Sequence, residues 1–130
     1  MATNFIVGNV SSVEGTRRTL SGNLELKFEV AVNSTRRGAT GDHSDDRPQY
    51  YTVVAYGSLA ENTALTFSRH EKNGVGVRLV IGARRRDRST TLVADQIAPD
   101  LRWVTATLTK SGPNPEPTEA RILEPLTAVA

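Results

Sequence analysis

The sequence contains no cysteine and only two histidines, His43 and His70, among its 130 residues. Without cysteine there is no disulfide, thiolate zinc site, iron–sulfur cluster or catalytic thiol. Two histidines argue against a multi-histidine metal site. His43 stands among three carboxylates, Asp42, Asp45 and Asp46, but such a run in a polar loop is typical of a solvated segment. We therefore expect a domain with no metal and no other cofactor.

Long apolar runs are missing as well. The run Leu79–Ala83 is short, far below the roughly 20 residues of a membrane helix. The opening MATNFIVGNV lacks the basic lead and sustained apolar stretch of a secretory signal. The sequence also shows no phosphate-binding glycine loop and no nucleophile–base arrangement. These absences predict a soluble, cytoplasmic protein that is not an enzyme and has no membrane partner.

The charge is unevenly distributed along the chain. The net charge is +2, from thirteen arginines and three lysines against fourteen acidic residues. Residues 1–110 carry fifteen basic and eleven acidic residues, giving +4, whereas residues 111–130 give −2. A basic body suits a protein that handles a polyanion. Arginine richness can equally reflect genome composition, so the count alone assigns no function.

Proline marks a boundary near the end of the chain. Four of the six prolines, Pro113, Pro115, Pro117 and Pro125, fall in the last eighteen residues. Proline lacks a backbone donor and cannot continue a sheet. We therefore predict a folded domain over residues 1–110 and a flexible, proline-rich tail over residues 111–130.

Before that boundary the pattern is mostly β. Residues 24–33 alternate apolar and polar side chains, as a strand with one buried face requires. Further strands are expected at residues 5–10, 50–56, 75–83 and 91–97, and an additional one at 103–109. Between the third and fourth strands, Ser58 and Glu61 have the spacing of a capping box that opens a helix, and Gly74 supplies its stop. This order predicts an all-β OB-fold, a five-stranded Greek-key barrel with one helix between strands 3 and 4, an extra C-terminal strand and a disordered tail.

Two groups of side chains are candidates for binding. Arg84, Arg85, Arg86 and Arg88 surround the single Asp87, and arginine matches phosphate and stacks on bases. They indicate either a phosphate site or a solvated charged hairpin. Tyr50 and Tyr56 are six residues apart and share one strand face, whereas Tyr51 points the other way. This pair could stack bases or simply pack at the barrel rim. Trp103 reads as packing or subunit interface.

Several segments in order resemble the bacterial-type single-stranded DNA-binding proteins, and most closely their actinobacterial branch. They are FIVGNV (5–10), TRRTLSGNLELKFEVAVNSTRR (16–37), YYTVVAYGSLAENTA (50–64), VGVRLVIGARRR (75–86) and ADQIAPDLRWVTATLTK (94–110). The resemblance implies a homotetrameric OB-fold that binds single-stranded DNA without reading its sequence. It also implies roles in replication, recombination or repair, and a place in the nucleoid.

The resemblance carries over to particular positions. Tyr50 falls where the family has a stacking aromatic, usually tryptophan, and Tyr56 falls on a second aromatic contact position. No aromatic residue occurs in 84–91, and the arm after the second strand has arginines where a tryptophan is common. We expect arginine to replace rings on this surface and binding to be more sensitive to salt. The predicted DNA-binding set is Tyr50, Tyr56, Arg84, Arg85, Arg86, Arg88, Arg36, Arg37, Arg17 and Arg18.

The tail departs from the family pattern. The sequence finishes LEPLTAVA, without the acidic cluster and terminal aromatic that recruit replication and repair proteins in such families. This departure counts against recruitment of partners through the tail and favours a paralogue or a phage- or plasmid-encoded version. Two alternatives remain open. One is an RNA-binding or primosome-type OB module, and the other is an OB-like protein–protein adaptor with incidental arginines.

Overall fold

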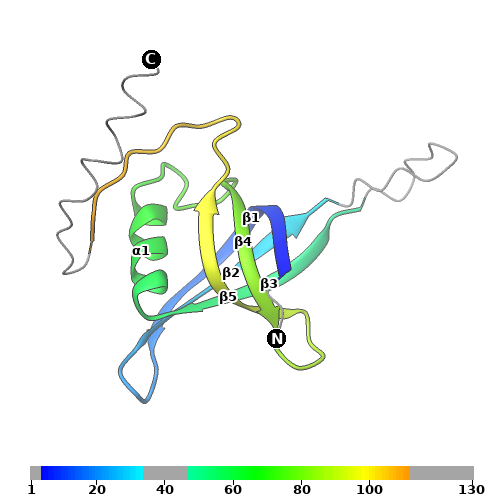
Figure 1. Ribbon diagram of the computed structural model, residues 1–130, viewed down its shortest axis with the longest axis vertical. Coiled ribbons are helices and arrows are strands. Elements are labelled where there is room, and N and C mark those ends of the chain that lie inside the picture. The colour runs from blue at the N-terminus through cyan, green and yellow to red at the C-terminus, as the bar shows by residue number, and fades with distance from the viewer. Residues whose placement is uncertain (1–3, 34–46, 112–130) are drawn as a thin grey trace, which may run out of the picture.

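A computed structural model describes residues 4–33 and 47–111 of the chain. It contains five strands and one helix (Figure 1). The strands are β1 (Asn4–Arg18), β2 (Leu24–Val32), β3 (Gln49–Tyr56), β4 (Arg78–Arg85) and β5 (Thr91–Pro99), and the helix α1 (Gly57–Ser68) lies between β3 and β4. No helix in these two ranges is long and apolar enough to cross a membrane.

The strands close into a barrel in the order β1-β2-β3-β5-β4. β1 pairs antiparallel with both β2 and β4, and its N-terminal half closes the barrel against β4. β3 joins β5 through a short parallel ladder from Thr52↔Thr91 to Val54↔Val93. A five-stranded Greek-key barrel with its helix between the third and fourth strands is the OB-fold, so the fold predicted from the sequence is confirmed.

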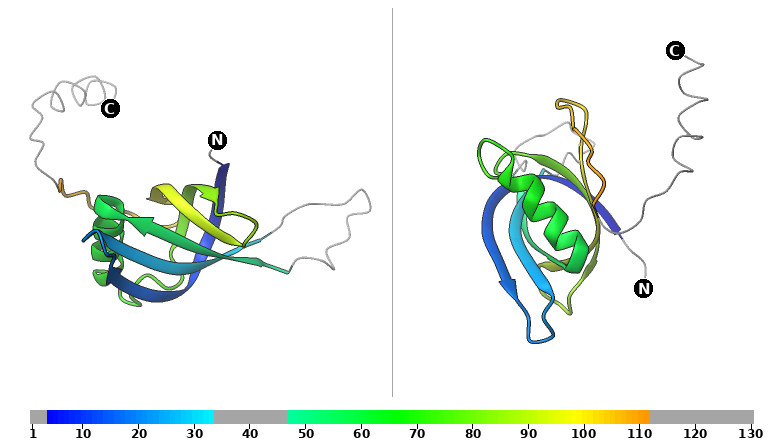
Figure 2. Two further views of the ribbon diagram at one scale, coloured as in Figure 1. Left: turned by 90° about the horizontal axis from the view of Figure 1, so that it is seen from below. Right: turned by 90° about the vertical axis from the view of Figure 1, so that its left-hand side faces the viewer.

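The core follows from the alternation along the strands. Leu26, Phe28 and Val30 of β2 point inward and are at most 1% exposed, because successive side chains of a strand face opposite sides. α1 lies across one open end of the barrel (Figure 2) and buries Ala60, Thr63 and Phe67. The Phe67 ring meets the Phe28 ring edge-on, with centroids 5.3 Å apart. This contact packs the helix against the core of the barrel.

The start of α1 differs from the sequence prediction. The N-cap residue is Tyr56, no side chain caps the helix, and Ser58 lies inside the first turn. The capping box is therefore wrong. β3 instead runs directly into the helix through Gly57, whose φ of +66° makes the turn that a serine cap would otherwise introduce. The helix ends at Ser68, and turns lead from there to Gly76, so the predicted stop at Gly74 comes too late.

Two other bounds differ. β1 extends to Arg18, well beyond the predicted residue 10, because two bulges, at Val10/Ser12 and Val13/Gly15, let it stay paired with β2. Residues 103–109, for which an additional strand is predicted, follow β5 in the chain and run alongside α1 (Figure 1). Within one chain it pairs with no strand of the described ranges. Ser111 Oγ donates a hydrogen bond of 2.8 Å to Asn62 Oδ1 of the helix.

Candidate nucleic-acid interface

The outer face of β2 and β3 carries the two candidate stacking rings. Val53 and Ala55 point into the core, so Tyr50 and Tyr56 point outward. Tyr50 is opposite Ala31 in the register and is 51% exposed, while Tyr56 is opposite Glu25 and half-buried. Six residues of strand separate the rings by about 20 Å. Tyr51 packs against the core, as the sequence predicts.

Two connections flank this face, and both carry predicted arginines. The first is the β1–β2 turn, in which the Thr19 N–H donates to the Asn23 carbonyl and the Gly22 N–H donates to the Thr19 carbonyl. Arg17 and Arg18 lead into it, and Arg18 Nη1 donates to the Gly22 carbonyl at 3.1 Å. The second is the β4–β5 loop, residues 86–90. In OB-folds the face of strands 2 and 3 and these two loops form the usual oligomer-binding surface.

The four arginines around Asp87 do not form one uniform patch. Arg84 projects outward from β4, and its Nε lies 3.5 Å from Asp95 Oδ2. Arg85 projects from the opposite face of the strand. Arg86 lies in the β4–β5 loop, and its Nη2 donates to the Tyr56 hydroxyl at 2.6 Å. Arg85 and Arg88 are exposed and form no ion pair with the part of the chain that the structure describes.

One continuous row crosses the outer face. Lys27 is paired with Val54, Val54 with Val93, and Val93 with Arg84, on β2, β3, β5 and β4 in turn. All four lie on the side away from the core, because their neighbours along each strand face inward, and Val54 is itself covered completely, with 0% exposure. Measured along the curved surface of the closed barrel, the path between the two cations is three strand spacings of about 4.8 Å, or roughly 14 Å. The row therefore has a cation at each end and a largely covered apolar middle.

A buried carboxylate lies between Tyr56 and the arginines. Glu25 is 5% exposed, and Arg17 Nε forms an ion pair with Glu25 Oε1. Tyr56 is directly opposite Glu25 in the β2–β3 register, so its hydroxyl is the hydrogen-bond donor nearest to this carboxylate on β3. The hydrogen bond from Arg17 lowers the pKa of Glu25 below its ordinary value; burial opposes this, and the Tyr56 hydrogen bond adds to it. The hydrogen bond to Glu25 in turn raises the pKa of Arg17.

Sequence reasoning missed Glu25 as a member of the site. It also missed Lys27, although the alternation already put both residues on the wetter face of this strand. For Lys27 that alternation was a sufficient signal. For Glu25 no local signal existed, because its contacts depend on how β1, β2 and β3 are aligned. The other acidic residue of this face, Glu29, accepts a 2.8 Å hydrogen bond from Ser11 Oγ.

Some predicted residues lie outside the described ranges. These are Arg36 and Arg37 of the candidate binding set and the acidic run around His43. In the residues that are described, no three histidine, aspartate or glutamate side chains gather as metal ligands.

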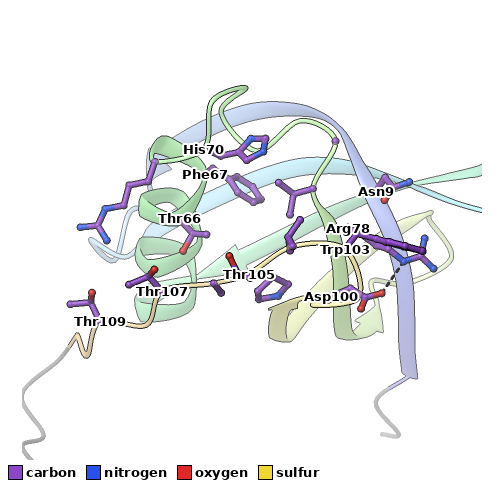
Figure 3. A pocket seen from close by; sticks show the side chains of 16 residues that line it. Asn9, Thr66, Phe67, His70, Arg78, Asp100, Trp103, Thr105, Thr107 and Thr109 are labelled. Atoms are coloured by element: carbon purple, nitrogen blue, oxygen red, sulfur yellow. Dashed lines mark hydrogen bonds and ion pairs between the residues drawn. The ribbon is translucent and has the colours of Figure 1, made fainter.

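A cavity of about 730 Å³ lies between the end of α1 and the segment that follows β5 (Figure 3). Phe67 and His70 line it from the helix side, and Trp103 and Thr105 line it from the C-terminal segment. Trp103 is 78% exposed, and the Arg102 guanidinium lies 5.5 Å from the centre of its ring. Trp103 therefore belongs to the lining of this cavity.

Comparison with known proteins agrees with this geometry. Residues 1–99 match the model of the single-strand binding protein family. The chain belongs to this family. It is a family of DNA-binding proteins rather than of enzymes, and the resemblance inferred from the sequence is confirmed. No curated protein sequence matches the chain.

Solved structures show the same likeness. The second single-stranded DNA-binding protein of Mycobacterium smegmatis is 25% identical to this chain, with a TM-score of 0.61. The alignment covers 84% of this chain and 98% of the Mycobacterium chain. A small single-stranded DNA-binding protein of Streptomyces coelicolor is also 25% identical, with a TM-score of 0.56 and coverage of 76% and 92%. The protein priB of Ralstonia solanacearum, 13% identical with a TM-score of 0.55 and coverage of 77% and 99%, shares the fold alone.

Proposed function

We propose that this protein binds single-stranded DNA without sequence preference and protects it during replication, recombination or repair. The strand crosses the outer face of β2 and β3 from the β1–β2 turn to the β4–β5 loop. The observation that carries the proposal is the outward placement of Tyr50 and Tyr56 on a face flanked by arginines. Every base has a π-face, so stacking on these rings favours no sequence.

Phosphate contacts supply the second part of the mechanism. Arg88 and Arg85 are exposed beside the face, and Arg17 and Arg18 stand at its other side. Guanidinium groups bind phosphate through paired N–H donors and release condensed counterions as they do so. Binding is therefore expected to weaken steeply with salt. Arg36 and Arg37 are proposed to add to this positive surface from the arm between β2 and β3.

We also propose a homotetramer. Support comes from an apolar patch on the outside of β1 and β4, away from the tyrosines. Phe5 is 62% exposed and Val7 is 36% exposed. The Phe5 ring lies over Gly82, where a Cβ would stand only 2.8 Å from the ring edge. Exposed apolar patches of this kind mark protein–protein contacts, and the partner is a second copy of this chain.

The direct test is a binding assay with labelled oligo-dT, duplex DNA and RNA at two salt concentrations. Strong binding to oligo-dT that grows with length, and little binding to duplex, is the expected result. Preference for RNA would indicate the RNA-binding module, and no oligonucleotide binding at low salt would leave the protein–protein adaptor. Mass measurement in solution, with and without long oligo-dT, tests the tetramer.

Substitutions then test the face itself. Tyr50→Ala and Tyr56→Ala should each weaken oligo-dT binding by about 1–3 kcal/mol, or about 5- to 150-fold, without unfolding the protein. Leu65→Ala is the matched control, because it removes an exposed apolar side chain from α1. If both tyrosine variants bind like the control, the stacking assignment is refuted.

A further inference from the structure

Four side chains at one end of the candidate face form a single connected group, which we call the Glu25 cluster: Arg17, Glu25, Tyr56 and Arg86. They come from β1, β2, β3 and the β4–β5 loop. Glu25 is in the middle and is almost fully buried, although it is on the outer face of the barrel. A carboxylate at this place is unexpected on a surface that attracts polyanions, and it calls for a specific role.

Each arginine of the cluster keeps part of its guanidinium available. Arg17 uses Nε for Glu25, so both of its terminal amino groups remain for another acceptor, and its side chain is 73% exposed. Arg86 uses Nη2 for the Tyr56 hydroxyl. These bonds hold one guanidinium group at Glu25 and the other at the Tyr56 hydroxyl without saturating either of them.

The direction of the hydrogen bonds is fixed by the donors present. Arginine only donates, so the Tyr56 oxygen accepts from Arg86. Tyr56 is directly opposite Glu25 in the β2–β3 register, and an ionised carboxylate only accepts, so between these two side chains the Tyr56 hydroxyl is the donor. Arg86 therefore donates to Tyr56, and Tyr56 and Arg17 both donate to Glu25. The Glu25 carboxylate is the last acceptor of the chain, and it anchors the ring and both arginines.

We propose that Glu25 is a positioning residue of the single-stranded DNA interface. It fixes the Tyr56 ring and the Arg17 guanidinium, and through the Tyr56 hydroxyl also Arg86, in the arrangement that receives one base with the phosphates on either side of it. The inference rests on the proposed function, because it assigns a role within that face. Glu25 itself does not touch the DNA.

This role predicts an effect opposite in sign to simple electrostatics. Removing a negative charge from a polyanion-binding face would by itself tighten binding and leave every bound phosphate in place. If Glu25 positions the cluster, Glu25→Gln instead weakens oligo-dT binding roughly tenfold, the size of one missing hydrogen bond to a charged group. The slope of log affinity against log salt becomes shallower by about 0.7 for each phosphate that the variant no longer neutralises.

Glu29→Gln is the matched control. Glu29 lies on the same strand and the same face, but within residues 4–33 and 47–111 its hydrogen-bond partner is Ser11 rather than a tyrosine or an arginine. It should therefore show the electrostatic effect alone, which is binding equal to or tighter than that of the unmodified chain. Thermal melts of both variants separate a folding defect from a binding defect.

Tyr56→Phe is the second variant, and it keeps the proposal testable should Glu25→Gln fold poorly. It removes the linking hydroxyl and keeps the ring, so it should weaken binding as Glu25→Gln does. The double variant should be no weaker than the weaker single one, because both changes break the same link.

The outcomes separate the inference from the proposed function. If the unmodified chain does not bind oligo-dT, the proposed function fails. If it binds, and Glu25→Gln or Tyr56→Phe binds as tightly or more tightly, the positioning role alone is overturned. Additive losses in the double variant would also overturn it.

Discussion

Gly74 and Gly76 are two positions at which substitution by alanine measures how tightly the turn after α1 packs against the core. Both lie in the turn after α1 and both have positive φ, +96° and +93°. An added Cβ at Gly76 meets nothing within 4 Å, whereas at Gly74 it stands 2.6 Å from the Phe67 ring. Substitution by alanine therefore imposes a similar backbone strain at both sites and a steric clash at only one.

The size of the difference can be worked out from these distances. Positive φ costs a non-glycine residue about 1–2 kcal/mol, so Gly76→Ala should lose about that much. Gly74→Ala should lose a further 1–3 kcal/mol, roughly the cost of overpacking a core. The Phe67 ring cannot move aside cheaply, because it is 4% exposed and pressed against Phe28.

Thermal unfolding followed by circular dichroism is the assay. For a domain of this size each kcal/mol corresponds to about 4–8 °C in Tm, so Gly74→Ala should melt well below Gly76→Ala. Urea midpoints should show the same order. Equal Tm values for the two variants would refute the reasoning, because the strain common to both would then account for everything and the clash with Phe67 for nothing.

The remaining predictions concern pH, salt and the core. The pKa of Glu25 is lowered in the folded protein, so its contribution to stability is complete above its unfolded pKa, near the ordinary 4.5, and is lost as the pH falls below that value. Glu25→Gln should flatten the dependence of Tm on pH in that acid range, and a parallel curve would contradict this. Arg88→Ala should make the salt slope of oligo-dT binding shallower by about 0.7, while Arg69→Ala, at the far end of α1, should leave the slope as it is. Phe28→Ala should cost about 3–5 kcal/mol of unfolding free energy in urea titrations; a cost below about 1 kcal/mol, well under that range, would show that the ring does not anchor the helix.

The fold was predictable where a local pattern agrees with the tertiary structure. The alternation over residues 24–32 identifies β2 and its buried face, since one strand with one buried face shows a period of two. β1 was only partly predictable. Its bulges at Val10/Ser12 and Val13/Gly15 shift the phase of the side chains, so a count with period two stops near residue 10.

The candidate site was predictable to a similar extent. The spacing of Tyr50 and Tyr56 is sufficient to put both rings on one face. The ion pair between Arg84 and Asp95 was not predictable, because it depends on a register shift in the β4–β5 ladder between Gly82 and Ala83. The hydrogen bonds of the Glu25 cluster likewise depend on how β1, β2, β3 and the β4–β5 loop are aligned with one another. They join residues eight apart on β1 and β2 and 30 apart between β3 and the β4–β5 loop, and no periodicity connects them.

The two tyrosines of the face are not equivalent, and the difference is in their hydroxyls. The Tyr56 hydroxyl is held between Glu25 and Arg86, so its ring has one orientation before any ligand arrives. Tyr50 is more exposed, and within the described ranges its hydroxyl has no hydrogen-bond partner. A ring that is already fixed loses less conformational entropy on binding than one that is free. We therefore propose that Tyr56 is the fixed platform of the DNA-binding face and Tyr50 the adaptable one, with the buried carboxylate of Glu25 beside Tyr56 serving to hold the fixed ring.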